Sequence, residues 1–163
     1  MTDRSTSDNA VKEPSYKLSQ TGPTVFRYQK PSTVPGKQVV VLARTDRMFA
    51  GVQVLTEGGE NNLHKHPLTD GCWLVLNGRV RFYGANDVVL AELGKHEGIL
   101  IPRGTLYWFE SCSEEELEIL QFDAFDRPMP NLDQVIGDRV NAKPDPRDWK
   151  KKVLMHDGRV WKS

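Results

Sequence analysis

The 163-residue chain lacks the features of membrane, secreted disulfide-rich and nucleic-acid-binding proteins. Only two cysteines occur, Cys72 and Cys112, which are too few for a disulfide framework. No apolar run approaches the roughly 18 residues that a membrane-spanning helix needs, and residues 1–15 lack the apolar stretch of a secretory signal. Neither charge is in excess, because 22 Lys and Arg balance 22 Asp and Glu. We therefore expect a cytoplasmic protein with no nucleic-acid partner and no membrane partner.

The chain is also poor in apolar residues, which make up 38% of it, so part of it is expected to lie outside the core. Residues 1–22 are rich in Ser, Thr, Asp and Lys and are predicted to form a disordered or docked arm. Residues 23–126 are predicted to form one β-barrel domain. Residues 127–163 form a polar tail with two isolated tryptophans, which we expect to pack on the barrel or on a partner subunit.

The segment between Val39 and Phe125 has an almost entirely β pattern. Short runs rich in β-branched and aromatic residues are separated by Gly, Asn and Asp clusters. This spacing is typical of an all-β sandwich or barrel. The Asn77-Gly78 pair between two apolar runs predicts a tight β-hairpin turn. The runs span residues 39–43, 49–55, 72–84, 88–93, 98–102, 106–109 and 117–125.

His64 and His66 are the residues that most suggest chemistry. Side chains two residues apart on a strand point to the same face. Two neighbouring imidazoles can therefore chelate one divalent transition metal. Such a pair on its own is more often accidental or purely structural, so the surrounding sequence has to indicate whether it forms a metal site.

That context resembles the first conserved motif of the cupin superfamily, G-x5-H-x-H-x(3,4)-E-x6-G, over residues 58–78. The positions in register are Gly58, His64, His66 and Gly78. Residues 94–109 resemble the second cupin motif, with the core P-x-G-x-x-H, and match it at Pro102 and Gly104.

The resemblance extends over residues 39–125 and implies a fold. The expected fold is an all-β cupin double-stranded β-helix, a jelly-roll barrel, with an N-terminal arm and a C-terminal tail. Cupins of this size are usually dimeric, so the resemblance implies a homodimer that takes a small-molecule ligand or substrate.

Two departures from the motifs affect the expected metal site. The glutamate of the first motif falls at Gly71, and the histidine of the second falls at Tyr107. The resemblance therefore transfers only His64 and His66 as metal ligands. A third ligand would have to come from Asp70, which is one residue from the glutamate position, or from Tyr107, Gln53 or Gln121.

Three kinds of site remain open at this point. The first is a small cupin enzyme that holds Fe, Mn, Ni or Zn at His64, His66 and Asp70. It would act on an organic acid, diketone or aromatic metabolite as a dioxygenase, decarboxylase, lyase or isomerase. The second is a metal-free enzyme in which His64 or His66 is the general base and Tyr107 the general acid. The third is a non-catalytic module that only binds a small molecule.

The resemblance to cupins implies which face of each strand lines the cavity, and alternation shows which side chains share that face. Tyr107 and Phe109 share a face, and Trp73 shares the face of Gly71. Together with Gln53 and Gln121, these residues are expected to line the cavity. An aromatic lining of this kind favours a planar or apolar organic ligand.

Overall fold

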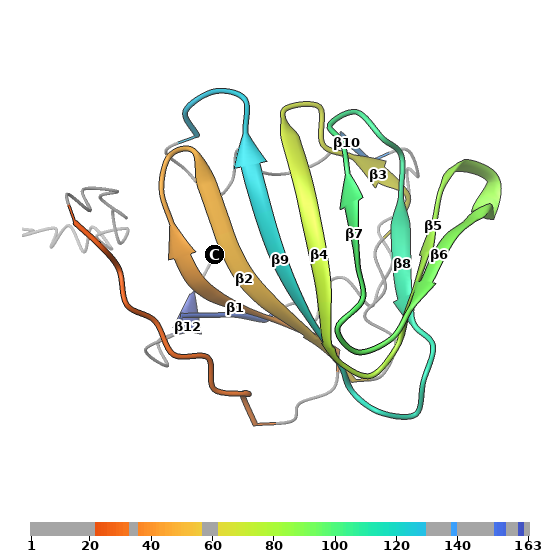
Figure 1. Ribbon diagram of the computed structural model, residues 1–163, viewed down its shortest axis with the longest axis horizontal. Coiled ribbons are helices and arrows are strands. Elements are labelled where there is room, and N and C mark those ends of the chain that lie inside the picture. The colour runs from red at the N-terminus through yellow and green to blue at the C-terminus, as the bar shows by residue number, and fades with distance from the viewer. Residues whose placement is uncertain are drawn as a thin grey trace, which may run out of the picture.

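The computed structural model describes residues 22–32, 36–56 and 62–129, together with the backbone of three short strands nearer the C-terminus (Figure 1). One 3-10 turn, η1 (Ala85–Asp87), interrupts an otherwise β architecture in this part of the chain. The strands are β1 (Lys37–Arg44), β2 (Met48–Leu55), β3 (His64–Lys65), β4 (Thr69–Asn77), β5 (Val80–Tyr83), β6 (Val89–Leu93), β7 (Gly98–Ile101), β8 (Trp108–Ser111), β9 (Leu117–Phe125), β10 (Asp138–Arg139), β11 (Lys152–Met155) and β12 (Val160–Trp161).

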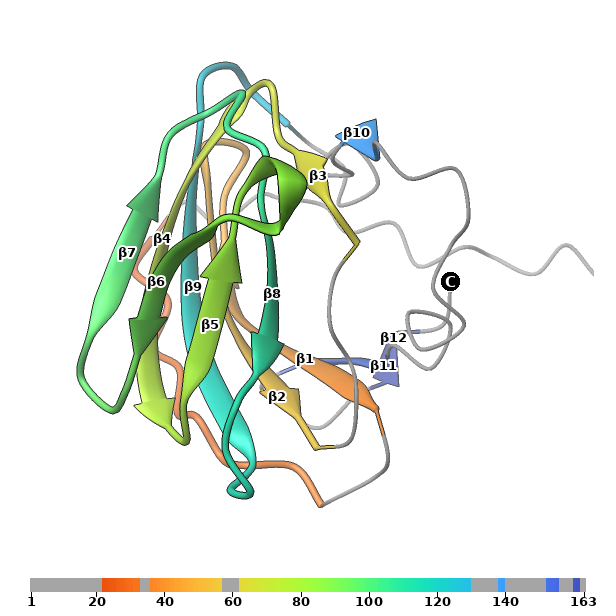
Figure 2. The ribbon, with the colours of Figure 1, turned by 90° about the vertical axis from the view of Figure 1, so that its right-hand side faces the viewer.

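The described strands form a seven-stranded sheet, a three-stranded sheet and a two-stranded sheet. The strand orders are β12-β11-β1-β2-β9-β4-β7, β6-β5-β8 and β10-β3. All pairs are antiparallel except β1 with β11. The predicted all-β fold is confirmed, and each predicted apolar run overlaps one strand or, for residues 72–84, two strands (Figure 2).

The turn at Asn77-Gly78 does not close a hairpin, so that prediction is wrong. Gly78 has the positive φ of 74° that the turn signal requires. However, β4 pairs with β7 and β9, whereas β5 pairs with β6 and β8. The turn is therefore the corner at which the chain passes from the large sheet to the small one. The turn residues set the local φ angle, whereas the burial of strand faces determines which strands pair.

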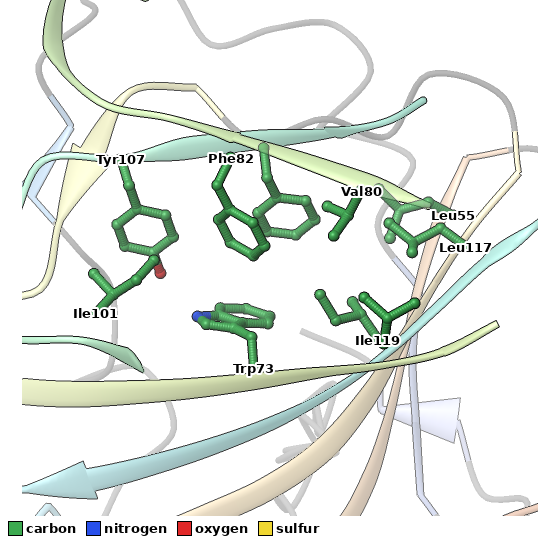
Figure 3. Close-up of a cluster of buried hydrophobic side chains, with 10 residues drawn as sticks. Leu55, Trp73, Val80, Phe82, Ile101, Tyr107, Leu117 and Ile119 are labelled. Atoms are coloured by element: carbon green, nitrogen blue, oxygen red, sulfur yellow. The ribbon is translucent and has the colours of Figure 1, made fainter. Parts of the chain in front are cut away.

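The barrel core lies between the large and the small sheet, and aromatic rings fill it (Figure 3). Trp73 on β4 lies 5.3 Å from Phe109 on β8 and 6.0 Å from Phe82 on β5, measured between ring centroids. These three side chains are fully or almost fully buried. Their contacts hold the two sheets together. The remaining core members are Leu55, Val75, Val80, Ile101, Tyr107, Leu117 and Ile119.

Segments that precede and follow the barrel strands in the sequence contact the barrel. Tyr28 packs against the apolar side chains on the second face of β1 and β2, and its hydroxyl donates to Glu118 at 2.6 Å. In the predicted tail, β11 pairs with β1 and β10 pairs with β3. Residues 1–21 of the predicted arm lie outside the described residues. Within the part of the chain that is described, no helix has the length and apolar character to cross a bilayer.

Gly98→Ala tests the pairing of β7 with β4. Gly98 lies opposite Leu74, and a Cβ atom there would overlap the backbone carbonyl oxygen of Trp73. Because a backbone atom must then move, we expect the free energy of unfolding in urea to fall by about 1–3 kcal/mol. Gly84→Ala is the matched control, since its Cβ would meet only the flexible side chain of Leu90 at 3.2 Å. An equal loss in both variants would contradict the pairing.

Candidate functional site

His64, His66 and Tyr107 come together at one end of the barrel, where β3 lies beside the start of β8 (Figure 2). His64 and Tyr107 form an antiparallel bridge, in which the N–H of His64 donates to the carbonyl of Tyr107 at 3.1 Å and the reverse bond measures 2.9 Å. The ring centroid of His64 lies 4.5 Å from that of Tyr107 and 4.9 Å from that of His66. The backbone therefore holds the phenol against the histidine pair.

A backbone contact orients the ring of His64. Its Nδ1 lies 2.7 Å from the carbonyl oxygen of Asn62. A carbonyl oxygen only accepts hydrogen bonds, so Nδ1 carries the proton in the neutral ring. The lone pair of the neutral imidazole is then on Nε2.

A small pocket opens beside these residues, with a volume of about 10 Å³, which is close to what one ordered water needs. His66 and Tyr107 line one part of it, and Gly71 on β4 and Asp123 on β9 line another. The remaining lining residues are Thr69, Ile101, Pro102 and Thr105. The pocket thus joins an imidazole, a phenol and a carboxyl group at the end of an apolar barrel.

Asp123 is the buried acid of the site, with 4% of its surface exposed. Burial disfavours the carboxylate and raises its pKa to about 6, although a hydrogen bond from Gln121 opposes the shift. The Nε2 group of Gln121 donates to Asp123 Oδ2 at 2.7 Å, and Gln53 Nε2 donates to Gln121 Oε1 at 2.7 Å. Two glutamine amides therefore support one oxygen of the carboxyl group.

Tyr107 is a neutral hydrogen-bonding group in this pocket. It is 4% exposed, and burial raises the pKa of its phenol, with a smaller contribution from the charge of Asp123. The phenol therefore keeps its proton at neutral pH. A protonated phenol donates to an oxygen atom and is a poor metal ligand.

The structure brings several of the predicted site residues together. His66, Gly71 and Tyr107 line the pocket, and His64 lies against two of them. Gln121 reaches the site through Asp123, and Gln53 lies one hydrogen bond further away.

Of the aromatic residues expected to line the cavity, Tyr107 borders the pocket, whereas Trp73 and Phe109 do not. Trp73 and Phe109 pack against each other at 5.3 Å, and both are buried in the core. Their rings belong to the core cluster, and the pocket lies beside His66 and Tyr107 at the end of the barrel.

Asp70 is not placed with the histidines, so its predicted role as the third ligand requires correction. It alternates with the inward-facing Gly71, and its side chain binds Arg103 instead. The Arg103 Nη2 group donates to Asp70 Oδ2 at 2.7 Å, and the backbone N–H of Arg103 donates to Oδ1 at 2.8 Å. Arg103 also lowers the pKa of Asp70. A one-residue offset on a strand reverses the side-chain direction.

Sequence reasoning missed Asp123, although a signal for it was available. Gln121 is predicted to line the cavity, and alternation along the same strand leads from Gln121 to Asp123. Extending the period by one step would have placed a carboxyl group in the cavity.

The donors around His64 and His66 do not match the divalent metal that the cupin motifs imply. Among the described residues, no three His, Cys, Asp or Glu side chains come close enough to hold an ion. Two imidazoles and a neutral phenol fall short of the three protein ligands that open catalytic sites use. The described residues therefore do not fit a resident metal.

Solved structures share this fold. No protein-family model and no curated protein matches the chain. A Klebsiella pneumoniae conserved protein with a double-stranded β-helix domain is similar over 66% of this chain and 95% of its own, with 19% identity and a TM-score of 0.55. KdgF from a Halomonas species is similar over 63% and 94%, with 18% identity and a TM-score of 0.53.

An RmlC-like cupin family protein from Methanocaldococcus jannaschii is similar over 66% of this chain and 93% of its own, with 15% identity and a TM-score of 0.53. The chain therefore has the double-stranded β-helix fold of the cupins. At these identities, the likeness shows the fold alone.

The burial of Asp123 predicts a pH dependence of stability. The pKa of Asp123 is about 6 in the folded chain, above its ordinary value of 3.8. Between these two values the folded chain binds a proton that the unfolded chain does not, so the unfolding free energy falls as pH rises. Asp123→Asn removes this titration. As pH rises from about 4 to about 7, the free energy of unfolding of the variant, measured in urea, should rise by about 3 kcal/mol relative to that of the wild type.

Asp70→Asn is a control of opposite sign, because Arg103 lowers the pKa of Asp70 in the folded chain. Asp70 contributes stability that is present at neutral pH and lost as pH falls. The free energy of unfolding of Asp70→Asn should therefore lie closer to the wild-type value at low pH than at neutral pH. A flat difference for Asp123→Asn would mean that water reaches its carboxyl group.

Proposed function

We propose that the chain binds a small carbonyl compound at the mouth of the pocket at the barrel end, with one polar atom of the ligand inside it, and moves a proton on it. The observation that carries this proposal is the convergence of His66, Tyr107 and buried Asp123 on one small pocket. A barrel that needed only a packed core would gain nothing from burying a carboxyl group there, since burial destabilises its charged form. The alternative is a module that binds the ligand without catalysis, and the exchange experiment below distinguishes it from an enzyme.

The residues divide the work by their chemistry. His66 is the general base, because its imidazole lines the pocket and a neutral imidazole nitrogen can accept a proton. His64 packs against it, with its tautomer held by the carbonyl of Asn62. Tyr107 is protonated before the reaction. It then gives a hydrogen bond, or the proton itself, to the carbonyl oxygen on which negative charge develops. This division supports lyase or isomerase chemistry, in which a proton leaves the carbon next to a carbonyl.

The packed core limits the size of the ligand. The barrel interior below the pocket is filled by Trp73, Phe82 and Phe109, so a ligand enters only the polar end. This geometry favours small organic acids, ketones and diketones over aromatic metabolites.

Hydrogen–deuterium exchange tests the proposed reaction. In D2O, the protein should catalyse loss of the proton signal next to the carbonyl in at least one of pyruvate, acetone, hydroxyacetone and acetylacetone, measured by proton NMR. Tyr107→Phe should slow the exchange by about 10²-fold or more, because it removes one donor to the developing oxyanion. His66→Asn should abolish it.

His96→Asn is the matched control. His96 lies in the exposed turn at the opposite end of β4, where its N–H bonds the carbonyl of Val75. Its φ of 69° is a conformation that Asn tolerates. This variant should exchange at the wild-type rate. Binding without exchange would identify a binding module, and the absence of both would place the function elsewhere.

Metal content is a separate prediction for His64 and His66. Two imidazoles alone hold Fe, Mn, Ni or Zn loosely, so dialysis against a chelator should leave less than about a tenth of an equivalent per chain. Elemental analysis of untagged protein measures this, and the stripped protein should retain its exchange activity. A full equivalent that survives chelation would require a third ligand beyond the described residues and would support the metal-dependent reading.

A further inference from the structure

Gly71 leaves a gap between two polar atoms of the barrel interior. A Cβ atom at this position would lie 3.3 Å from Trp73 Nε1 and 3.4 Å from Asp123 Oδ1. Gly71 lies directly opposite Asp123 in the β4–β9 pair and lines the pocket with it. An indole donor and a carboxyl oxygen thus border the same space.

The indole N–H is the first of these groups. Trp73 is 2% exposed, and its Nε1 has no hydrogen-bond partner among the described residues. Buried donors of this kind are rare, because each gives up its hydrogen bond to water on folding. Figure 3 shows the indole nitrogen and the hydroxyl of Tyr107 at the same end of the core cluster, near Ile101. The donor therefore points toward the pocket end of the barrel.

Asp123 is the second group. Its Oδ2 accepts a hydrogen bond from Gln121, whereas its Oδ1 is the atom that borders the gap at Gly71. One carboxyl oxygen is therefore held by the protein, and the other faces the space beside the indole.

These two atoms select the group that can lie between them. It must accept from Trp73 Nε1–H and donate to Asp123 Oδ1, and the pocket has room for about one such atom. A carboxylate cannot donate and is repelled by Asp123 when that group is charged. An ammonium group cannot accept from the indole. A hydroxyl group does both through a single oxygen atom.

We propose that the gap beside Gly71 is a subsite for one hydroxyl group, held by Trp73 Nε1–H and Asp123 Oδ1. This inference rests on the proposed function, and it narrows the ligand to small carbonyl compounds that also carry a hydroxyl. When no ligand is bound, one water molecule satisfies the same two atoms.

The test compares hydroxyacetone with acetone, which differ by one hydroxyl group. The probe is the indole N–H signal of Trp73 in a nitrogen-15 spectrum, assigned by its loss in Trp73→Phe. Hydroxyacetone should shift this signal, and acetone should bind about tenfold or more weakly because it makes neither hydrogen bond. In Gly71→Ala the methyl group fills the gap, so hydroxyacetone should lose its advantage over acetone.

Two further variants keep the test decisive. Asp123→Asn keeps the volume of the side chain and removes the charged acceptor, so it should reduce the preference for hydroxyacetone even if Gly71→Ala folds poorly. Gly84→Ala, which lies between β5 and β6 and does not line the pocket, should leave the preference unchanged.

The outcomes separate the two proposals. Equal binding of hydroxyacetone and acetone to the wild type would overturn the hydroxyl subsite and leave the carbonyl pocket intact. Binding of neither compound would overturn both. A preference that persists in Gly71→Ala and in Asp123→Asn would place the hydroxyl contact elsewhere.

Discussion

The pairing of β4 with β9 is the constraint on which the rest of the site depends. In this register Trp73 lies opposite Gln121, and Gly71 lies opposite Asp123. Side chains alternate along both strands, so these positions share the inner face, while Cys72 and Phe122 are exposed. Trp73 spans the barrel to the rings on β5 and β8, and the next pair along offers space and a carboxyl group. A slip by one residue would bury a cysteine and a phenylalanine there and remove the site.

The same register explains how the barrel supplies a carboxyl group without the glutamate of the cupin motif. The position that the motif gives to glutamate is Gly71, and the carboxyl group comes from Asp123 on the neighbouring strand. A carboxyl group in this place is buried and is held by Gln121, and no cluster of three ligands forms around the histidines in the described chain. Moving the acid from β4 to β9 thus changes its chemistry. A carboxyl group on β9 favours proton transfer and hydrogen bonding over binding of a metal ion.

Most of the fold could be predicted from the sequence, because period-two alternation and turn residues are local signals. The strand from residue 117 to 125 was predicted with the bounds that the structure gives. The Asn77-Gly78 turn failed as a hairpin because partner choice depends on the burial of whole faces. Asp70 failed as a ligand because counting along a motif does not say which face a residue occupies. Asp123 was missed because no motif marks it, and only the pairing of two strands distant in sequence gives it a role.

Donors and acceptors in the pocket are divided between its two walls. The wall formed by β3 and the start of β8 carries the imidazole of His66 and the protonated phenol of Tyr107. The wall formed by β4 and β9 carries Gly71 and the carboxyl group of Asp123, and the indole N–H of Trp73 borders the space beside Gly71. Each wall therefore presents one group that donates and one that can accept a proton. A ligand with neighbouring carbonyl and hydroxyl oxygens can satisfy both walls at once, whereas a hydrocarbon or a lone anion leaves at least one buried polar group without a partner.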